Sequence, residues 1–203
     1  MEQPPPLSPE EVSNLAGAEY AQLGQPQTVK VFGILHIAFA AFGLLSSIWT
    51  IFISVAGNPF LNLSAANPAA QAQAKAQLAM EKQMLPATVA MTVLTVIIAA
   101  LMLTAGIKML KKRKDGLKWS NRYAWTSLFG KAINLVVAIT ISIPATKKMT
   151  NEIAGGTPVP GLIESMIVAG MIIGVLAACI YPILCLILLN KPAVKTWFAN
   201  QKE

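Results

Sequence analysis

Residues 111–118 read KKRKDGLK and lie between the second and third of four long apolar runs. The runs cover residues 31–55, 87–110, 123–143 and 162–189. Each reaches the roughly 20 residues that a helix needs to cross about 30 Å of hydrocarbon. A dense cationic segment between such runs is typical of a loop at a membrane surface. The sequence therefore predicts an all-α fold, an integral membrane four-helix bundle.

The composition supports a membrane protein, because 55% of the 203 residues are hydrophobic and only 12% are charged. A soluble domain has about twice that share of charge. The first 30 residues are polar and acidic, and no short apolar core with a small-residue cleavage pattern follows them. We therefore expect the first run to remain as an anchor.

The cations around the spans predict the orientation, since Lys and Arg accumulate on the cytoplasmic side. Seven of the sixteen lie at the end of the second run or between it and the third: Lys108, Lys111, Lys112, Arg113, Lys114, Lys118 and Arg122. A cytoplasmic loop places both termini in the cytoplasm, with Lys30, Lys191, Lys195 and Lys202. The opposite side carries only Lys75, Lys82, Lys147 and Lys148. We expect a multi-pass protein of the inner (plasma) membrane, N-in and C-in.

The net charge of +7 predicts contact with anionic lipid headgroups rather than with nucleic acid, because the cations concentrate at span ends. The residues expected to meet headgroups and to set the topology are Lys111, Lys112, Arg113, Lys114 and Lys118.

Two terminal segments flank the transmembrane domain of residues 30–190. Residues 1–29 form an acidic cytoplasmic tail, in which Ser8 and Pro9 favour a helix over 9–23. A loosely ordered tail is the alternative. Residues 191–203 form an interfacial tail with a short helix, whose Trp197 and Phe198 are expected at the headgroup boundary.

Two connections lie on the outer side. Residues 57–85 form the longer loop, where Asn67-Pro68 and an Ala/Gln-rich segment predict a short outer helix over about 68–84 before span two. Pro86 is expected to bend or break its junction with that span. Residues 146–161 contain Gly and Pro pairs and predict a turn-rich surface loop.

Small and polar residues recur at spacings of three and four along the first and third runs, which places them on one face of each helix. Helices in lipid associate through close approach and interhelical hydrogen bonds, so these faces predict packing within a bundle. The glycines expected at helix contacts are Gly33, Gly43, Gly170 and Gly174, the last two forming a GxxxG pair.

Three polar residues inside the spans form a candidate intramembrane site: His36, Lys131 and Asn134. An ionisable group within a bilayer costs at least a few kcal/mol unless it is paired or hydrated, so it is a functional candidate. His36 and Lys131 are expected in neighbouring layers. Two simpler interpretations are ordinary packing for His36 and snorkelling to the headgroups for Lys131. No acid in the spans offers a counter-ion, which disfavours a coupled proton carrier.

The sequence indicates no cofactor, no metal site and no catalytic residue. Cys179 and Cys185 lie six residues apart in the fourth run, which suits neither a disulfide framework nor a CxxC site. The one histidine has no nearby acid, so no hydrolytic constellation is recognisable. We expect a protein without enzymatic activity.

Three short motifs carry a resemblance: KVFGILH at residues 30–36, AGIKML at 105–110 and LNKPAVK at 189–195. Through these three motifs, the membrane core of the chain resembles small four-span bacterial inner-membrane proteins of unassigned function. The resemblance implies a bacterial inner membrane and transfers no active site.

Short loops and packing-rich spans favour a structural or accessory subunit of a membrane assembly, with other membrane subunits or further copies of itself as partners. The alternative is a small channel or transporter for an ion or small solute that uses the His36, Lys131 and Asn134 stripe.

Overall fold

The computed structural model describes residues 24–56, 68–153 and 161–201, which are helical with short turns and contain no strand. The elements are α2 (Gln27–Ala56), α4 (Pro68–Leu110), α5 (Gly116–Val137), the π-helical η1 (Ala138–Ser142), α6 (Ile143–Ile153), α7 (Gly161–Leu189) and α8 (Pro192–Ala199). The all-α four-helix bundle is confirmed. The helix predicted over residues 9–23 lies outside the described residues.

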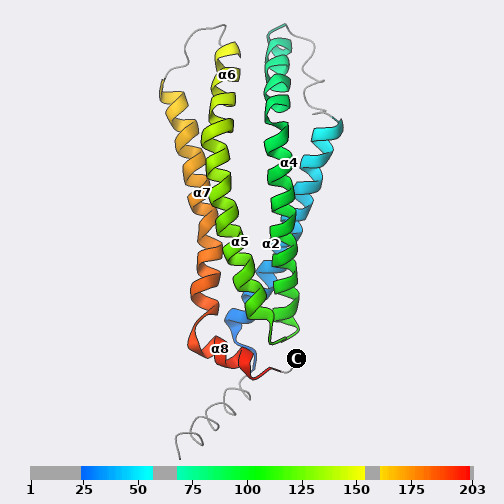
Figure 1. Cartoon of the computed structure of the whole chain (residues 1–203), viewed down its shortest axis with the longest axis vertical. Coiled ribbons are helices and arrows are strands. Elements are labelled where there is room, and N and C mark those ends of the chain that lie inside the picture. The colour runs from blue at the N-terminus through cyan, green and yellow to red at the C-terminus, as the bar shows by residue number, and fades with distance from the viewer. Residues whose placement is uncertain (1–23, 57–67, 154–160, 202–203) are drawn as a thin grey trace, which may run out of the picture.

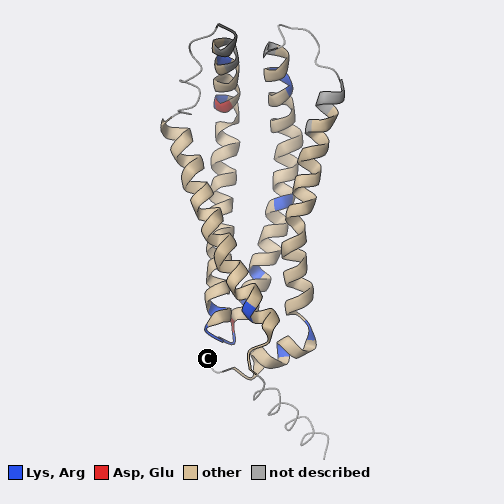
Figure 2. Cartoon of the chain, turned by 180° about the vertical axis from the view of Figure 1, so that it is seen from behind, with Lys and Arg blue, Asp and Glu red and all other residues tan. Residues whose placement is uncertain are grey.

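Four helical stretches are long and apolar enough to cross a membrane: Gln27–Ala56, Ala74–Leu110, Gly116–Asn151 and Val168–Leu189. They stand side by side, with α2 along α4, α4 along α5, and α5 along α7 (Figure 1). The start of α2, the 111–118 loop and α8 lie together at what we call the cationic end. Lys and Arg gather there (Figure 2). Toward the opposite, distal end α2 and α7 diverge, whereas α4 and α6 remain in contact.

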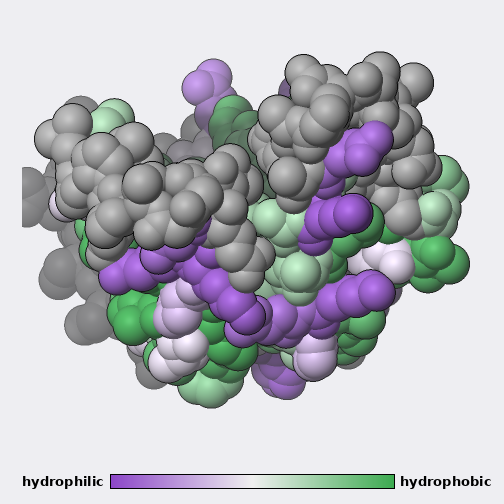
Figure 3. Space-filling model, turned by 90° about the horizontal axis from the view of Figure 1, so that it is seen from above, coloured by the Kyte–Doolittle hydropathy of each residue, from purple (hydrophilic) through white to green (hydrophobic). Residues whose placement is uncertain are grey.

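The lateral surface of the bundle is strongly apolar. Phe42, Val55 and Phe129 are 74%, 84% and 68% exposed, and many other large apolar side chains on the four long helices are also exposed. Hydrophilic side chains cap the visible helix ends at the distal end, with strongly apolar ones toward the periphery (Figure 3). Such a surface is stable in hydrocarbon, which has no water to drive its burial. The chain is a multi-pass membrane protein.

The densest packing lies at the cationic end. Its core includes Phe32 of α2, Met109 of α4, Tyr123 of α5 and Leu189 of α7. The short helix α8 closes this end through Val194, Trp197 and Phe198, which are at most 5% exposed. Trp197 and Phe198, expected at the headgroup boundary, therefore pack against protein in the core at this end.

A short outer helix was expected to meet the second span at a junction bent or broken by Pro86. In the structure the two form one helix, α4, which continues through Pro86. A proline inside a helix removes one backbone hydrogen bond. The segment before Pro86 is rich in the strong helix formers Ala, Gln and Met. The segment after it is an apolar span, in which hydrocarbon requires every backbone group to be hydrogen-bonded within the helix.

The third span is longer than predicted and contains a π-helical segment. Helix continues through η1 and α6 to Ile153, so residues 146–153 are helical rather than loop. In η1 the Ile143 amide donates to the Ala138 carbonyl five residues earlier. Pro144 follows at once, and its ring would clash with the carbonyl four residues before it. A local widening to π geometry accommodates that proline.

Candidate functional site

His36 is the centre of a buried polar cluster at the cationic end. Its side chain has 0% exposure. Its Nδ1 lies 2.7 Å from the Phe32 carbonyl oxygen and 2.7 Å from the Tyr181 hydroxyl, and its Nε2 lies 3.2 Å from the Ser120 hydroxyl. The carbonyl can only accept, so the ring proton belongs on Nδ1, and Ser120 then donates to Nε2. Both ring nitrogens are therefore satisfied.

Aromatic rings enclose this cluster. The His36 ring lies 5.1 Å from Tyr123 and 5.6 Å from Tyr181 between centroids, and Phe32 and Phe39 each contact Tyr181. These contacts bring α2 against α7, which otherwise touch little. Because Tyr181 lies 145 residues from His36 in the sequence, the cluster closes the bundle between its first and last spans.

Lys131 and Asn134 do not join the His36 cluster. Lys131 is half-buried and Asn134 is exposed. Ser120, which contacts His36, precedes Lys131 by eleven residues on the same helix, a separation of about 16 Å at 1.5 Å per residue. No hydrogen bond or ion pair links either residue to His36 within the described chain. The structure therefore does not place His36 and Lys131 in neighbouring layers.

Two of the predicted packing glycines lie at the contact between α2 and α4. A Cβ added at Gly33 would lie 2.9 Å from Leu110, and one added at Gly43 would lie 3.6 Å from Ala99. Gly106 of α4 faces Gly33, and its added Cβ would lie 2.8 Å from the Gly33 carbonyl oxygen. Only glycine permits so close an approach of two backbones.

The other two, Gly170 and Gly174, have a different environment. A Cβ added at either would meet nothing within 4 Å, and both residues are exposed on α7. The GxxxG face of α7 is therefore not used for packing among the described residues of this chain.

The cationic loop is a tight turn. Arg113 N–H donates to Lys108 and Lys112 N–H to Met109, the pattern of a Schellman motif, with Lys112 at a φ of 56°. The Asp115 carboxylate accepts a hydrogen bond from Lys108 and lies 3.7 Å from the Arg113 Nε. Both contacts, that of Lys108 above all, hold the pKa of Asp115 below its usual value.

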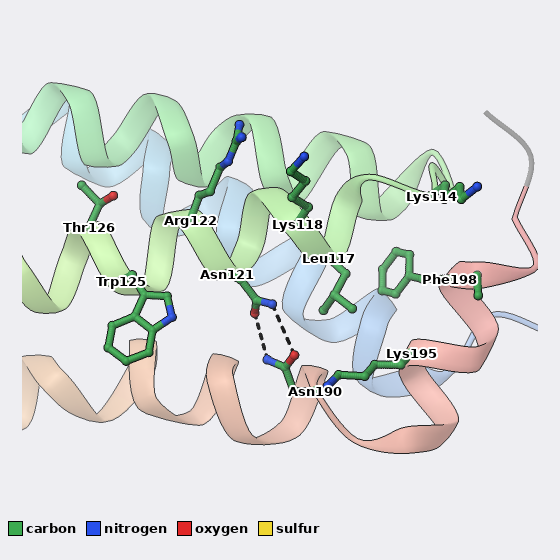
Figure 4. A pocket seen from close by; sticks show the side chains of 11 residues that line it. Lys114, Leu117, Lys118, Asn121, Arg122, Trp125, Thr126, Asn190, Lys195 and Phe198 are labelled. Carbon is green, nitrogen blue, oxygen red and sulfur yellow. Dashed lines mark hydrogen bonds between the residues drawn. The ribbon is translucent and has the colours of Figure 1, made fainter.

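The predicted headgroup residues Lys111, Lys112, Arg113, Lys114 and Lys118 are all exposed at this end. Lys114 and Lys118 also line a groove of about 760 Å³ between α5, the end of α7 and α8 (Figure 4). Arg122 and Lys195 line the same groove, although they were not predicted from the sequence to lie with these two lysines. The four-residue spacing of Lys118 and Arg122 was the available signal, whereas the place of Lys195 depends on how α8 folds back.

No group of three or more His, Cys, Asp or Glu side chains in the described ranges is arranged to hold a metal ion. Cys179 and Cys185 are free thiols. Comparisons with protein-family models, with curated proteins and with solved structures found no match.

Proposed function

We propose that this multi-pass membrane protein is a structural or accessory subunit of a membrane assembly. It would lie in the inner (plasma) membrane of a bacterium, with its cationic end and both termini in the cytoplasm. The charge asymmetry of the loops supports that orientation. The resemblance of the membrane core to small four-span bacterial inner-membrane proteins supports that location.

The observation that carries the proposal is the open GxxxG face of α7. Helices in lipid associate where small residues let backbones approach, and Gly33 and Gly106 already do this inside the chain. Gly170 and Gly174 offer the same surface with nothing against it. We assign this face to a transmembrane helix of another subunit.

The state of His36 favours a structural role over transport. Both of its ring nitrogens are engaged by neighbours, and it has no exposed surface. An ion or solute path through His36 would have to break these contacts, so the cluster suits a fixed bundle closure.

The test is native electrophoresis of the complex extracted in mild detergent, with mass spectrometry of each band. We expect co-migration with another polypeptide in fixed ratio. Gly170→Leu should abolish co-migration, because its side chain fills the contact. Ala169→Leu, a similar increase in size at an adjacent exposed residue of α7, should retain it.

Equal co-migration of the two variants with the partner would contradict the proposed contact. Migration of the wild-type chain alone or as a homo-oligomer would instead favour the channel or transporter. Flux measurements on Lys131→Ala and His36→Ala variants would then follow, since those residues are the candidates for a permeation path.

A further inference from the structure

The groove at the cationic end is lined by cations from two helices. Lys118 and Arg122 extend from the same side of α5, and Lys195 extends from α8 toward Asn190 (Figure 4). None of the residues that line the groove is acidic. Asp115, the acid described at this end, is already engaged by Lys108 and Arg113. The groove therefore presents several cations without a carboxylate from the described residues.

Two of these cations, Lys118 and Arg122, are neighbours on α5 despite their like charge. Lys118 and Arg122 are four residues apart on α5, a spacing at which like charges repel on a helix. Arg122 also lies over the Trp119 ring, with 5.2 Å from its guanidinium carbon to the ring centroid, which restricts its position. An anion between the two side chains would relieve their repulsion, and a guanidinium matches a phosphate with paired N–H donors.

The base of the groove is built rather than incidental. Asn190 Nδ2 donates to Asn121 Oδ1 at 2.9 Å, and Asn121 Nδ2 donates to Asn190 Oδ1 at 3.3 Å (Figure 4). Asn190 also donates to the Leu186 carbonyl at 2.8 Å. These bonds fix the end of α7 against α5, so the distance between the two walls of the groove is set by hydrogen bonds.

The remaining surface of the groove is apolar. Leu117 and Phe198 lie at the end toward the loop, and Trp125 lies one turn beyond Asn121 in the direction of the membrane interior. Trp125 is 66% exposed, as is usual for an indole at the level where headgroups meet acyl chains. A soluble phosphate would contact only the cationic side chains, whereas a phospholipid would contact the cationic and the apolar side chains.

We propose that this groove binds one anionic phospholipid. The phosphate lies beside Lys118 and Arg122, Lys195 adds positive charge from the opposite wall, and an acyl chain passes Trp125 into the bilayer. Basic pockets between transmembrane helices on the cytoplasmic side are a known type of site for acidic lipid headgroups. The inference depends on the groove alone and is independent of the proposed subunit contact on α7.

The test is native mass spectrometry of the full-length protein in detergent, titrated with phosphatidylglycerol or with phosphatidylcholine. We expect one phosphatidylglycerol to bind in preference to phosphatidylcholine. The groove variant carries Lys118→Gln with Lys195→Gln, and neither lysine makes a side-chain hydrogen bond or ion pair with another described residue. We expect this variant to lose affinity for phosphatidylglycerol by about tenfold or more.

The control variant carries Lys111→Gln with Lys112→Gln, which removes the same charge from the exposed loop outside the groove. It should lose less than about twofold in affinity, because these lysines do not line the groove. Equal losses in the two variants, or none in the groove variant, would overturn the proposal. Displacement of phosphatidylglycerol by inorganic phosphate at equal concentration would also overturn it, since the ligand would then be a soluble anion.

Discussion

The two ends of the bundle are built from the same four helices but pack differently. At the cationic end, α2, α4, α5, α7 and α8 surround a shared core, and His36 joins the first span to the last. Toward the distal end α2 and α7 diverge while α4 stays in contact with α6, and the GxxxG face of α7 is open. The difference teaches that hydrophobicity alone does not choose the contacts of this bundle, because large apolar side chains are exposed on all four long helices. Close packing occurs where glycines meet and polar side chains pair.

The largest expected effect tests the glycine contact at the tight end. Gly106→Ala places a Cβ 2.8 Å from the Gly33 carbonyl oxygen, a backbone atom that cannot move alone. We expect the free energy of unfolding to fall by about 2–3 kcal/mol. Reversible unfolding in mixed micelles with a denaturing detergent measures this change.

Gly174→Ala is the matched control, because its Cβ meets nothing within 4 Å. We expect no loss of stability and a gain of up to about 1 kcal/mol from helix propensity. A loss as large as that of Gly106→Ala would mean that α7 is packed at the distal end, and the contrast between the ends would fail.

The second effect tests the polar closure. His36→Ala leaves the buried Ser120 hydroxyl and the half-buried Tyr181 hydroxyl without their ring partner, and we expect the free energy of unfolding to fall by about 2 kcal/mol. The control is Thr50→Val farther along α2, where the hydroxyl bonds only the Ser46 carbonyl of its own helix, and about 0.5 kcal/mol or less is expected. The same unfolding measurement applies, and equal losses would refute the closure.

The smallest effect concerns pH at the cationic turn. The pKa of Asp115 is lowered from 3.8 in the folded state, chiefly by the hydrogen bond from Lys108, so its ionised form stabilises the fold. That contribution is complete above about pH 4–5 and is lost as the pH falls through the folded pKa. It is less than about 1 kcal/mol, because the pair is partly exposed.

Unfolding measured between neutral and acidic pH should show this loss in the wild type and not in Asp115→Asn. Glu81→Gln, an acid replaced toward the distal end, should keep the acid-dependent loss because Asp115 is intact. If Asp115→Asn kept the full acid-dependent loss of stability, the ionised Asp115 carboxylate would not be its source.

The four spans were predictable because the thickness of the hydrocarbon constrains each helix separately. Only the first and last residues of the spans differ from the predicted ones. Pro86 was expected to bend or break the junction before the second span, yet α4 continues through it as one helix. Trp197 and Phe198 were expected at the headgroup boundary, and in the structure both are buried in the core between the span ends. Local patterns do not record how much space remains between elements.

The sequence by itself determined the class of solvent, the number of spans and the clustering of positive charge at one end, since each depends on a local run of residues. Only the tertiary structure decided that His36 meets Tyr181 and Ser120 rather than the layer of Lys131. It also decided which glycines are packed, and it brought Lys195 to the groove that Lys118 lines from the other wall. The physical reason is that helices with several similar apolar faces choose their neighbours through the packing of the whole bundle.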